Sequence, residues 1–214
     1  MTRKGGDMIL ELKQTGRGFC TAGFAIKRLT EETGTVSLSG KPWSMEAYIS
    51  GIYRGMEFEM LPDRHSAAGK KRFRPYRIRQ DGRETGSVYQ TIHKDSMCKS
   101  SGYHRMEKDG MIYSMYPVGF GIEGSRCPVY CGDRQTAQAE KDGTVHNDMH
   151  YYRILATDEN AAFTTVLFCM YMYVNACYKP GKRAALSEVK TVSVTTDRFL
   201  KEKYNPDFRE RITD

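Results

Sequence analysis

A long uncharged segment constrains the fold more than any other feature of the chain. Residues 160–178 read NAAFTTVLFCMYMYVNACY, nineteen residues without a charge in a chain that is 28% charged. Such a segment must either cross a membrane or be buried inside protein, because a helix that is apolar all round requires apolar surroundings. The choice between these two environments decides the architecture.

The length of the segment is compatible with a membrane span, which needs about 20 predominantly apolar residues. The basic residues Lys179, Lys182 and Arg183 follow it, as a positive-inside orientation requires. Its composition favours burial inside protein instead, since polar residues such as Thr164 and Asn175 interrupt a segment that contains few strong aliphatic residues.

Both ends of the segment carry helix boundary signals. Thr157 and Asp158 can cap a helix N-terminus, and acidic residues in the first turn interact favourably with the helix dipole. The sequence Lys-Pro-Gly at 179–181 is typical of a helix end. We therefore predict a buried apolar helix over about residues 159–178.

Most of the remaining chain has the pattern of short strands separated by turns. The clearest hairpins flank Asp81-Gly82 and Lys108-Asp109-Gly110. Strands at this spacing predict a β-sandwich or β-barrel. The other boundaries that we expect are a single domain over 8–204, a last strand over 189–195, a short C-terminal helix over 196–204, and flexible termini at 1–7 and 205–214.

The order of motifs from Tyr76 onward is similar to that of a known family: a strand hairpin, a strand pair, a Tyr-x-Ile strand, an acidic cap and an apolar helix. The matching positions are Tyr76, Ile78, Gly82, Gly86, Val88, Pro128, Val129, Tyr130, Asp133, Tyr152, Ile154, Asp158 and Glu159. On these positions the chain resembles bacterial members of the Tubby C-terminal-like superfamily, which includes LURP-one-related proteins and phospholipid scramblases.

This resemblance covers about residues 8–200 and implies a mainly β fold. In that family a closed antiparallel barrel of about twelve strands surrounds a central buried apolar helix. The tail of about 35 residues after the helix departs from the family pattern. Tubby domains bind phosphoinositides, so the resemblance also implies lipid binding, but the family's binding residues do not align here and none is carried over.

The net charge of +7 is concentrated in one basic strip. Residues 70–83 contain seven basic residues and one acid, a net charge of +6. Such a strip indicates an anionic partner, and the alternative is a solvated strand edge on which charge prevents strand pairing. The candidate residues for anionic lipid are Lys70, Lys71, Arg72, Arg74, Arg77 and Arg79.

Few residues offer catalytic or metal-binding chemistry. His146 and His150 are four residues apart, as are Cys127 and Cys131, so a zinc site from these side chains is a weak alternative to isolated loop residues. The GxGxxG pattern at 119–124 precedes no helix and indicates a strand bend. We therefore expect no enzyme activity, no cofactor and no catalytic residue.

The expected function is a binding module that contacts anionic phospholipid. The alternative is a structural or regulatory scaffold for a protein partner. Nucleic acid is not the expected partner, because no nucleic-acid fold signature accompanies the tyrosines and arginines. The six cysteines form no compact framework and no signal peptide is visible, which favours a cytoplasmic protein, peripheral to the membrane where it binds lipid.

Overall fold

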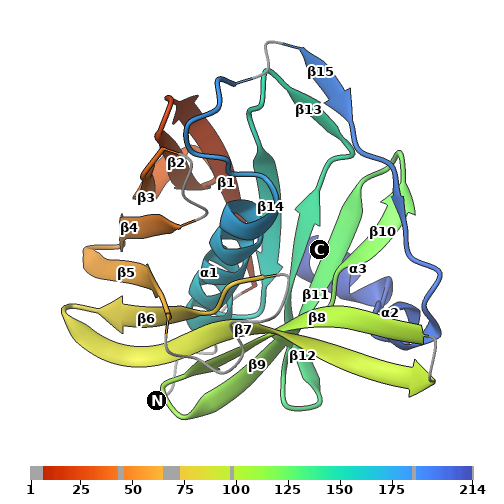
Figure 1. The fold of residues 1–214 in the computed structure, drawn as a ribbon. Helices are drawn as coiled ribbons and strands as arrows, with labels where there is room; N and C mark the ends of the chain where they lie inside the picture. The colour runs from red at the N-terminus through yellow and green to blue at the C-terminus, as the bar shows by residue number, and fades with distance from the viewer. Residues whose placement is uncertain (1–6, 43–45, 65–72, 97–98, 185–186, 214) are drawn as a thin grey trace.

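Neighbouring strands pair in order and close into a barrel (Figure 1). The computed structural model describes residues 7–42, 46–64, 73–96, 99–184 and 187–213. The barrel strands are β1 (Met8–Arg17), β2 (Thr21–Arg28), β3 (Glu31–Gly40), β4 (Ala47–Tyr53), β5 (Met56–Pro62), β6 (Tyr76–Gln80), β7 (Arg83–Ser96), β8 (Lys99–Lys108), β9 (Met111–Met115), β11 (Ser125–Cys131), β12 (Arg134–Lys141) and β14 (Tyr151–Ala156).

The barrel closes because β11 pairs with both β9 and β12. The sheet runs in the order β12-β14-β1-β2-β3-β4-β5-β6-β7-β8-β9-β11 and returns to β12. Among the described residues this ring contains twelve antiparallel strands, which confirms the predicted barrel and its number of strands.

Side-chain alternation and turn chemistry produce the hairpins. Along β1 the buried Leu10 and Leu12 alternate with less buried neighbours, as expected for a strand with one face in a core. In the β6–β7 turn, Asp81 and Gly82 have φ angles of 46° and 76°. Two consecutive residues with positive φ are typical of the tight turns whose twist matches that of a hairpin. Both predicted hairpins are confirmed.

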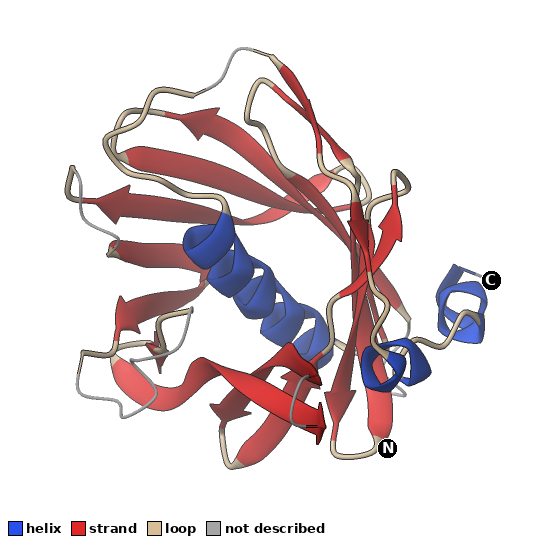
Figure 2. Cartoon of the chain, turned by 45° about the vertical axis from the view of Figure 1, so that its right-hand side comes forward, coloured by secondary structure: helices blue, strands red, loops and turns tan. Residues whose placement is uncertain are grey.

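Helix α1 (Glu159–Ala176) forms from the uncharged segment. The side chain of Asp158 caps it, accepting a hydrogen bond of 2.8 Å from the backbone N–H of Ala161. Thirteen residues of α1 are buried, and strands lie on several sides of the helix (Figure 2).

Aromatic contacts join α1 to the inward-facing side chains of the strands. Near its N-terminus, the ring of Phe163 stacks on Tyr53 at 5.2 Å and meets Phe58 edge-on at 5.3 Å. One turn from its C-terminus, Tyr173 meets Phe24 edge-on at 4.9 Å. These residues belong to a single hydrophobic cluster that extends through the barrel strands and α1.

The last predicted strand is divided in the structure. Short strands β15 (Glu188–Lys190) and β16 (Ser193–Val194) replace the single strand expected over 189–195, and they pair with β13 (Thr144–His146) and β10 (Val118–Gly121), respectively. A closed barrel has no free edge for another strand. Strands β15 and β16 therefore pair with β13 and β10, which are not part of the twelve-stranded ring.

Two helices cover the outer wall of the barrel. Helix α2 (Arg198–Glu202) lies within the predicted C-terminal helix and begins after the capping Asp197. Helix α3 (Asp207–Thr213) occupies a region that we expected to be a flexible terminus. Its Phe208 and Ile212 are buried against Leu155, so apolar contact with the wall orders this segment.

Candidate functional site

Three of the six candidate lipid-binding residues in the basic strip can be located in the structure. Lys70, Lys71 and Arg72 lie outside the described residues. Arg74 forms an ion pair of 3.1 Å with Glu46, so it does not present an uncompensated charge. A hydrogen bond from Arg64 lowers the pKa of the same Glu46 carboxyl below its ordinary value.

The two candidate residues of the strip on β6 lie among acids. Arg77 on β6 forms an ion pair of 3.5 Å with Glu84 on β7. Arg79 is in register with Glu59 on one side and Glu84 on the other. Opposite charges in directly facing positions stabilise a sheet, so this part of the strip is a balanced cross-strand network.

The two candidate metal histidines lie in different environments. The side chain of His146 is 69% exposed and lies 3.5 Å from Glu188, whereas His150 is buried against the ring of Tyr173. Burial, with Lys141 and Arg17 nearby, lowers the pKa of His150 to about 3. Within the described residues, no group of three or more metal-ligating side chains is present.

The two ends of the barrel differ in charge. The six connections at the end where α1 begins are 29–30, 54–55, 81–82, 109–110, 132–133 and 157–158. These connections contain one basic residue, Arg54, and four acids, Asp81, Asp109, Asp133 and Asp158. This end is therefore acidic.

The opposite end, where α1 terminates, has its basic residues gathered in three loops, while its other loops carry Glu123, Asp142 and Asp148. Its described charged residues in the loops after β3, β5 and α1 are Lys41, Arg64, Arg74, Lys179, Lys182 and Arg183, against Glu46 and Asp63. The predominance of basic side chains produces a positive potential that attracts anions.

Three segments meet at this end, and we call their five exposed residues the basic cap: Phe19, Lys41, Lys179, Lys182 and Arg183. The backbone N–H of Gly181 donates a hydrogen bond of 2.8 Å to the carbonyl of Phe19, which joins the β1–β2 turn to the segment after α1. A Cβ atom at Gly40, the residue before Lys41, would lie 3.0 Å from Pro180.

The side chains of the basic cap are exposed. Phe19 is 52% exposed. Lys41, Lys179, Lys182 and Arg183 are also exposed, and no ion pair involves them among the described residues. The cap thus combines an exposed aromatic ring with uncompensated positive charge.

A buried polar network supports the cap from below. The guanidinium of Arg17, whose side chain is 4% exposed, forms an ion pair of 2.9 Å with Asp148 and donates a hydrogen bond of 3.1 Å to the hydroxyl of Tyr173. The hydroxyl of Tyr178 donates to the carbonyl of Cys20 at 2.5 Å. These bonds attach the β1–β2 turn to the end of α1.

Part of the basic cap was recognisable in the sequence, although not as a binding surface. Lys179, Lys182 and Arg183 stood out as the basic flank of an apolar segment, but Phe19 and Lys41 did not. Only the pairing of β1 with β2 and of β3 with β4 brings these two residues to the end of α1.

The chain matches no family model, no curated protein and no solved structure. The resemblance to the Tubby C-terminal-like superfamily therefore receives neither support nor conflict from these comparisons. Across the described ranges, no helix, α1 included, has the combined length and hydrophobicity that a membrane crossing requires.

Proposed function

We propose that this protein is a non-enzymatic binding module that contacts anionic phospholipid headgroups through its basic cap. The observation that carries the proposal is that four exposed cations, which form no ion pair within the described residues, lie on segments that meet the β1–β2 turn with its exposed Phe19. Lys70, Lys71 and Arg72 of the predicted strip lie outside the described residues, and the proposal does not rest on them.

The contributions of the individual cap residues to membrane binding add up. Each basic residue near an anionic bilayer contributes about 1 kcal/mol to binding, and the contribution falls within a Debye length of the surface. Phe19 would add apolar contact at the headgroup level, where amphipathic and aromatic groups stabilise peripheral binding. The acidic opposite end would orient the barrel with its cap toward the lipid.

We also infer that α1 serves as the central packing element of the barrel. Its buried side chains and its aromatic contacts with β2, β4 and β5 support this role. A helix in this position leaves the barrel ends and outer wall as the surfaces on which a ligand can bind.

Vesicle co-sedimentation tests the proposal. Vesicles of phosphatidylcholine are compared with vesicles that also contain phosphatidylserine, at low and high salt. We expect binding only to the anionic vesicles, with weaker binding at high salt. The double variant Lys182→Ser/Arg183→Ser should lose about 2 kcal/mol, which is roughly a 30-fold weaker partition coefficient.

The matched control is Lys27→Ser/Arg83→Ser, which removes the same charge near the end where α1 begins. This variant should bind within about twofold of the wild type. Equal losses in both double variants would show that only net charge matters and would refute the cap. No binding to either vesicle would instead favour the alternative function, a structural or regulatory scaffold for a protein partner.

A further inference from the structure

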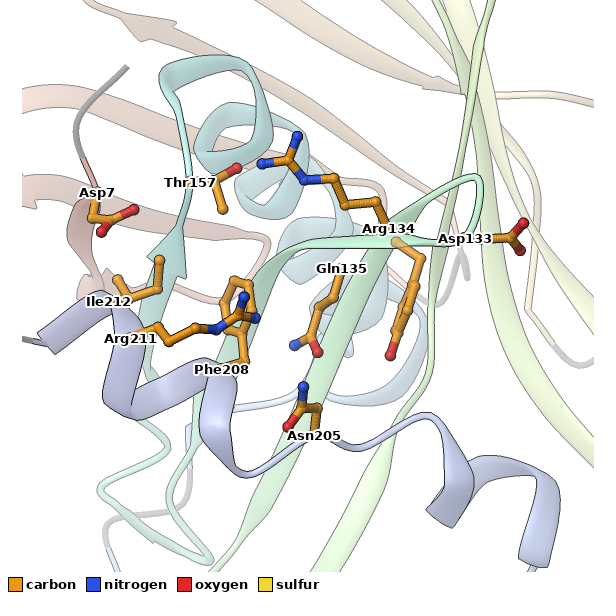
Figure 3. Close-up of a pocket in the computed structure, with 10 residues that line it drawn as sticks. Asp7, Asp133, Arg134, Gln135, Thr157, Asn205, Phe208, Arg211 and Ile212 are labelled. Atoms are coloured by element: carbon orange, nitrogen blue, oxygen red, sulfur yellow. The ribbon is translucent and has the colours of Figure 1, made fainter. Parts of the chain in front are cut away.

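A cavity of about 640 Å³ lies between α3 and the outer wall of the barrel, at the beginning of β12 (Figure 3). It is on a different surface from the basic cap. Polar side chains from β12, from α3 and from the residues before α3 line it together with Phe208; Arg134 extends toward Thr157, while Gln135 and Asn205 face each other. The cavity is therefore assembled only when the C-terminal segment packs on the wall.

One buried polar atom in the cavity lacks a partner. The side chain of Gln135 lines the cavity, the residue is 9% exposed, and its Oε1 accepts no hydrogen bond. Its Nε2 donates to the carbonyl of Ala137 at 3.4 Å. An unsatisfied buried acceptor destabilises the folded state, so such an atom in a folded protein requires an explanation. A ligand with a hydroxyl or amino donor would satisfy it.

Two arginines on separate elements line the same cavity. Arg134 begins β12 and Arg211 lies on α3, and no ion pair involves either guanidinium in the described part of the chain. Asp133 points away from the cavity in Figure 3, and Asp7 lies at its far edge. The planar guanidinium group suits carboxylate and phosphate, which it can bind through two hydrogen bonds.

Asn205 adds a further donor. Its Oδ1 accepts a hydrogen bond of 3.0 Å from the backbone N–H of Asp207, which orients the carboxamide. The amide nitrogen then faces Gln135 across the cavity (Figure 3). The cavity thus offers donors from Arg134, Arg211 and Asn205, beside one unsatisfied acceptor.

We propose that this cavity binds a small organic anion that carries hydroxyl groups, such as a polyol phosphate or a hydroxy acid. The arginines and Asn205 bind the phosphate or carboxylate, and Gln135 Oε1 accepts a hydrogen bond from a neighbouring hydroxyl. The burial of Phe208 and Ile212 holds α3 in place, so that the site exists before the ligand binds.

Isothermal titration calorimetry on the full chain tests this assignment with four probes. Glycerol 3-phosphate and glycerate each combine an anion with hydroxyls, propyl phosphate lacks the hydroxyls, and glycerol lacks the charge. We expect a dissociation constant on the order of 1 mM or tighter for at least one of the first two probes, and at least about tenfold weaker binding of the last two. Which of the first two binds distinguishes phosphate from carboxylate.

Arg211→Gln should weaken binding at least about tenfold, whereas Arg209→Gln should not. Arg209 is the matched control because it is on the same helix, pairs with Glu140 at 3.7 Å and does not line the cavity. Gln135→Leu should equalise the affinities for propyl phosphate and glycerol 3-phosphate. It should also raise the melting temperature by about 2–4 °C, because it removes a buried unpaired acceptor.

Absence of binding by all four probes, or equal losses in the Arg211 and Arg209 variants, would overturn the assignment. The result is independent of the lipid proposal. Lys182→Ser/Arg183→Ser should retain binding of the soluble anion, since its substitutions lie in the basic cap, and Arg211→Gln should retain binding to anionic vesicles.

Discussion

We predict that the buried His104 makes the stability of this protein depend on pH. It is 3% exposed, its ring stacks on Phe73 at 5.2 Å, and it meets Tyr171 edge-on at 5.4 Å. Its Nδ1 has no hydrogen-bond partner. Burial in this aromatic environment lowers the pKa of His104 from 6.5 to about 3, because the charged ring would lose its hydration.

The direction of the pH effect follows from proton binding. Below pH 6.5 the histidine of the unfolded chain binds a proton, whereas the folded protein excludes that proton until the pH approaches 3. The contribution to stability is therefore fully present above the unfolded pKa and decreases as the pH falls. The decrease is about 1.4 kcal/mol for each pH unit in this window.

His150 has a similar lowered pKa of about 3, caused first by burial and then by Lys141 and Arg17. The two histidines together should reduce the free energy of unfolding of the wild type by about 2.7 kcal/mol between about pH 7.5 and 5.5. This is a measurable fraction of the 5–15 kcal/mol that is typical of a folded domain.

Substitution of His104 isolates its contribution to the pH dependence of the free energy of unfolding. His104→Phe retains a flat ring for the contacts with Phe73 and Tyr171, but it cannot titrate. We expect this variant to lose only about 1.3 kcal/mol over the same pH interval, half of the wild-type loss. His104→Gln also lacks a titrating group and should show the same smaller loss, even though its absolute stability differs.

Urea unfolding at a series of pH values provides the measurement, with the free energy of unfolding extrapolated to zero denaturant. For each protein, the free energy of unfolding at pH 5.5 is subtracted from its own value at pH 7.5. Effects of the substitution on packing are the same at both pH values and therefore cancel. An unchanged pH dependence in both variants would contradict this prediction, because it would show that His104 is protonated in the folded protein at pH 5.5.

Three further predictions concern the fold and are measured by the same urea unfolding. Asp158→Ala should cost about 1 kcal/mol, because it removes the side chain that caps α1. Gly86→Ala should cost about 3 kcal/mol, since its Cβ would lie 1.8 Å from a backbone carbonyl oxygen, whereas Gly16→Ala, which has no neighbour within 4 Å, should cost nothing. Phe168→Asp should abolish cooperative unfolding, since the side chain is fully buried on α1.

Local chemistry explains which parts of the fold could be predicted from the sequence. The turn at Asp81-Gly82 requires positive φ at both positions, a rare demand that this dipeptide meets. The boundaries of α1 follow from Asp158 at one end and from Pro180 after the other. Signals of this kind act within a few residues, so they appear in the sequence itself.

Sites formed by distant segments could not be predicted in this way. The placement of Arg79 between Glu59 and Glu84 depends on strand register, and a shift of one residue would place these side chains on opposite faces. The basic cap unites Phe19 with Lys182, which are remote in the chain. Such proximity depends on closure of the barrel, which no local pattern encodes.

The same closure explains why the candidate sites lie outside the barrel. A ring of twelve strands encloses more space than its own side chains can fill, since barrel diameter grows with the number of strands. We infer that α1 fills this space, which would leave the interior to packing. The chain can then place chemistry in two regions, the loops at the barrel ends and the wall covered by its C-terminal helices. The basic cap occupies the first region and the cavity beside α3 occupies the second. Substitutions in one region should therefore leave binding in the other unchanged, since residues that are distant and share no partners contribute independently.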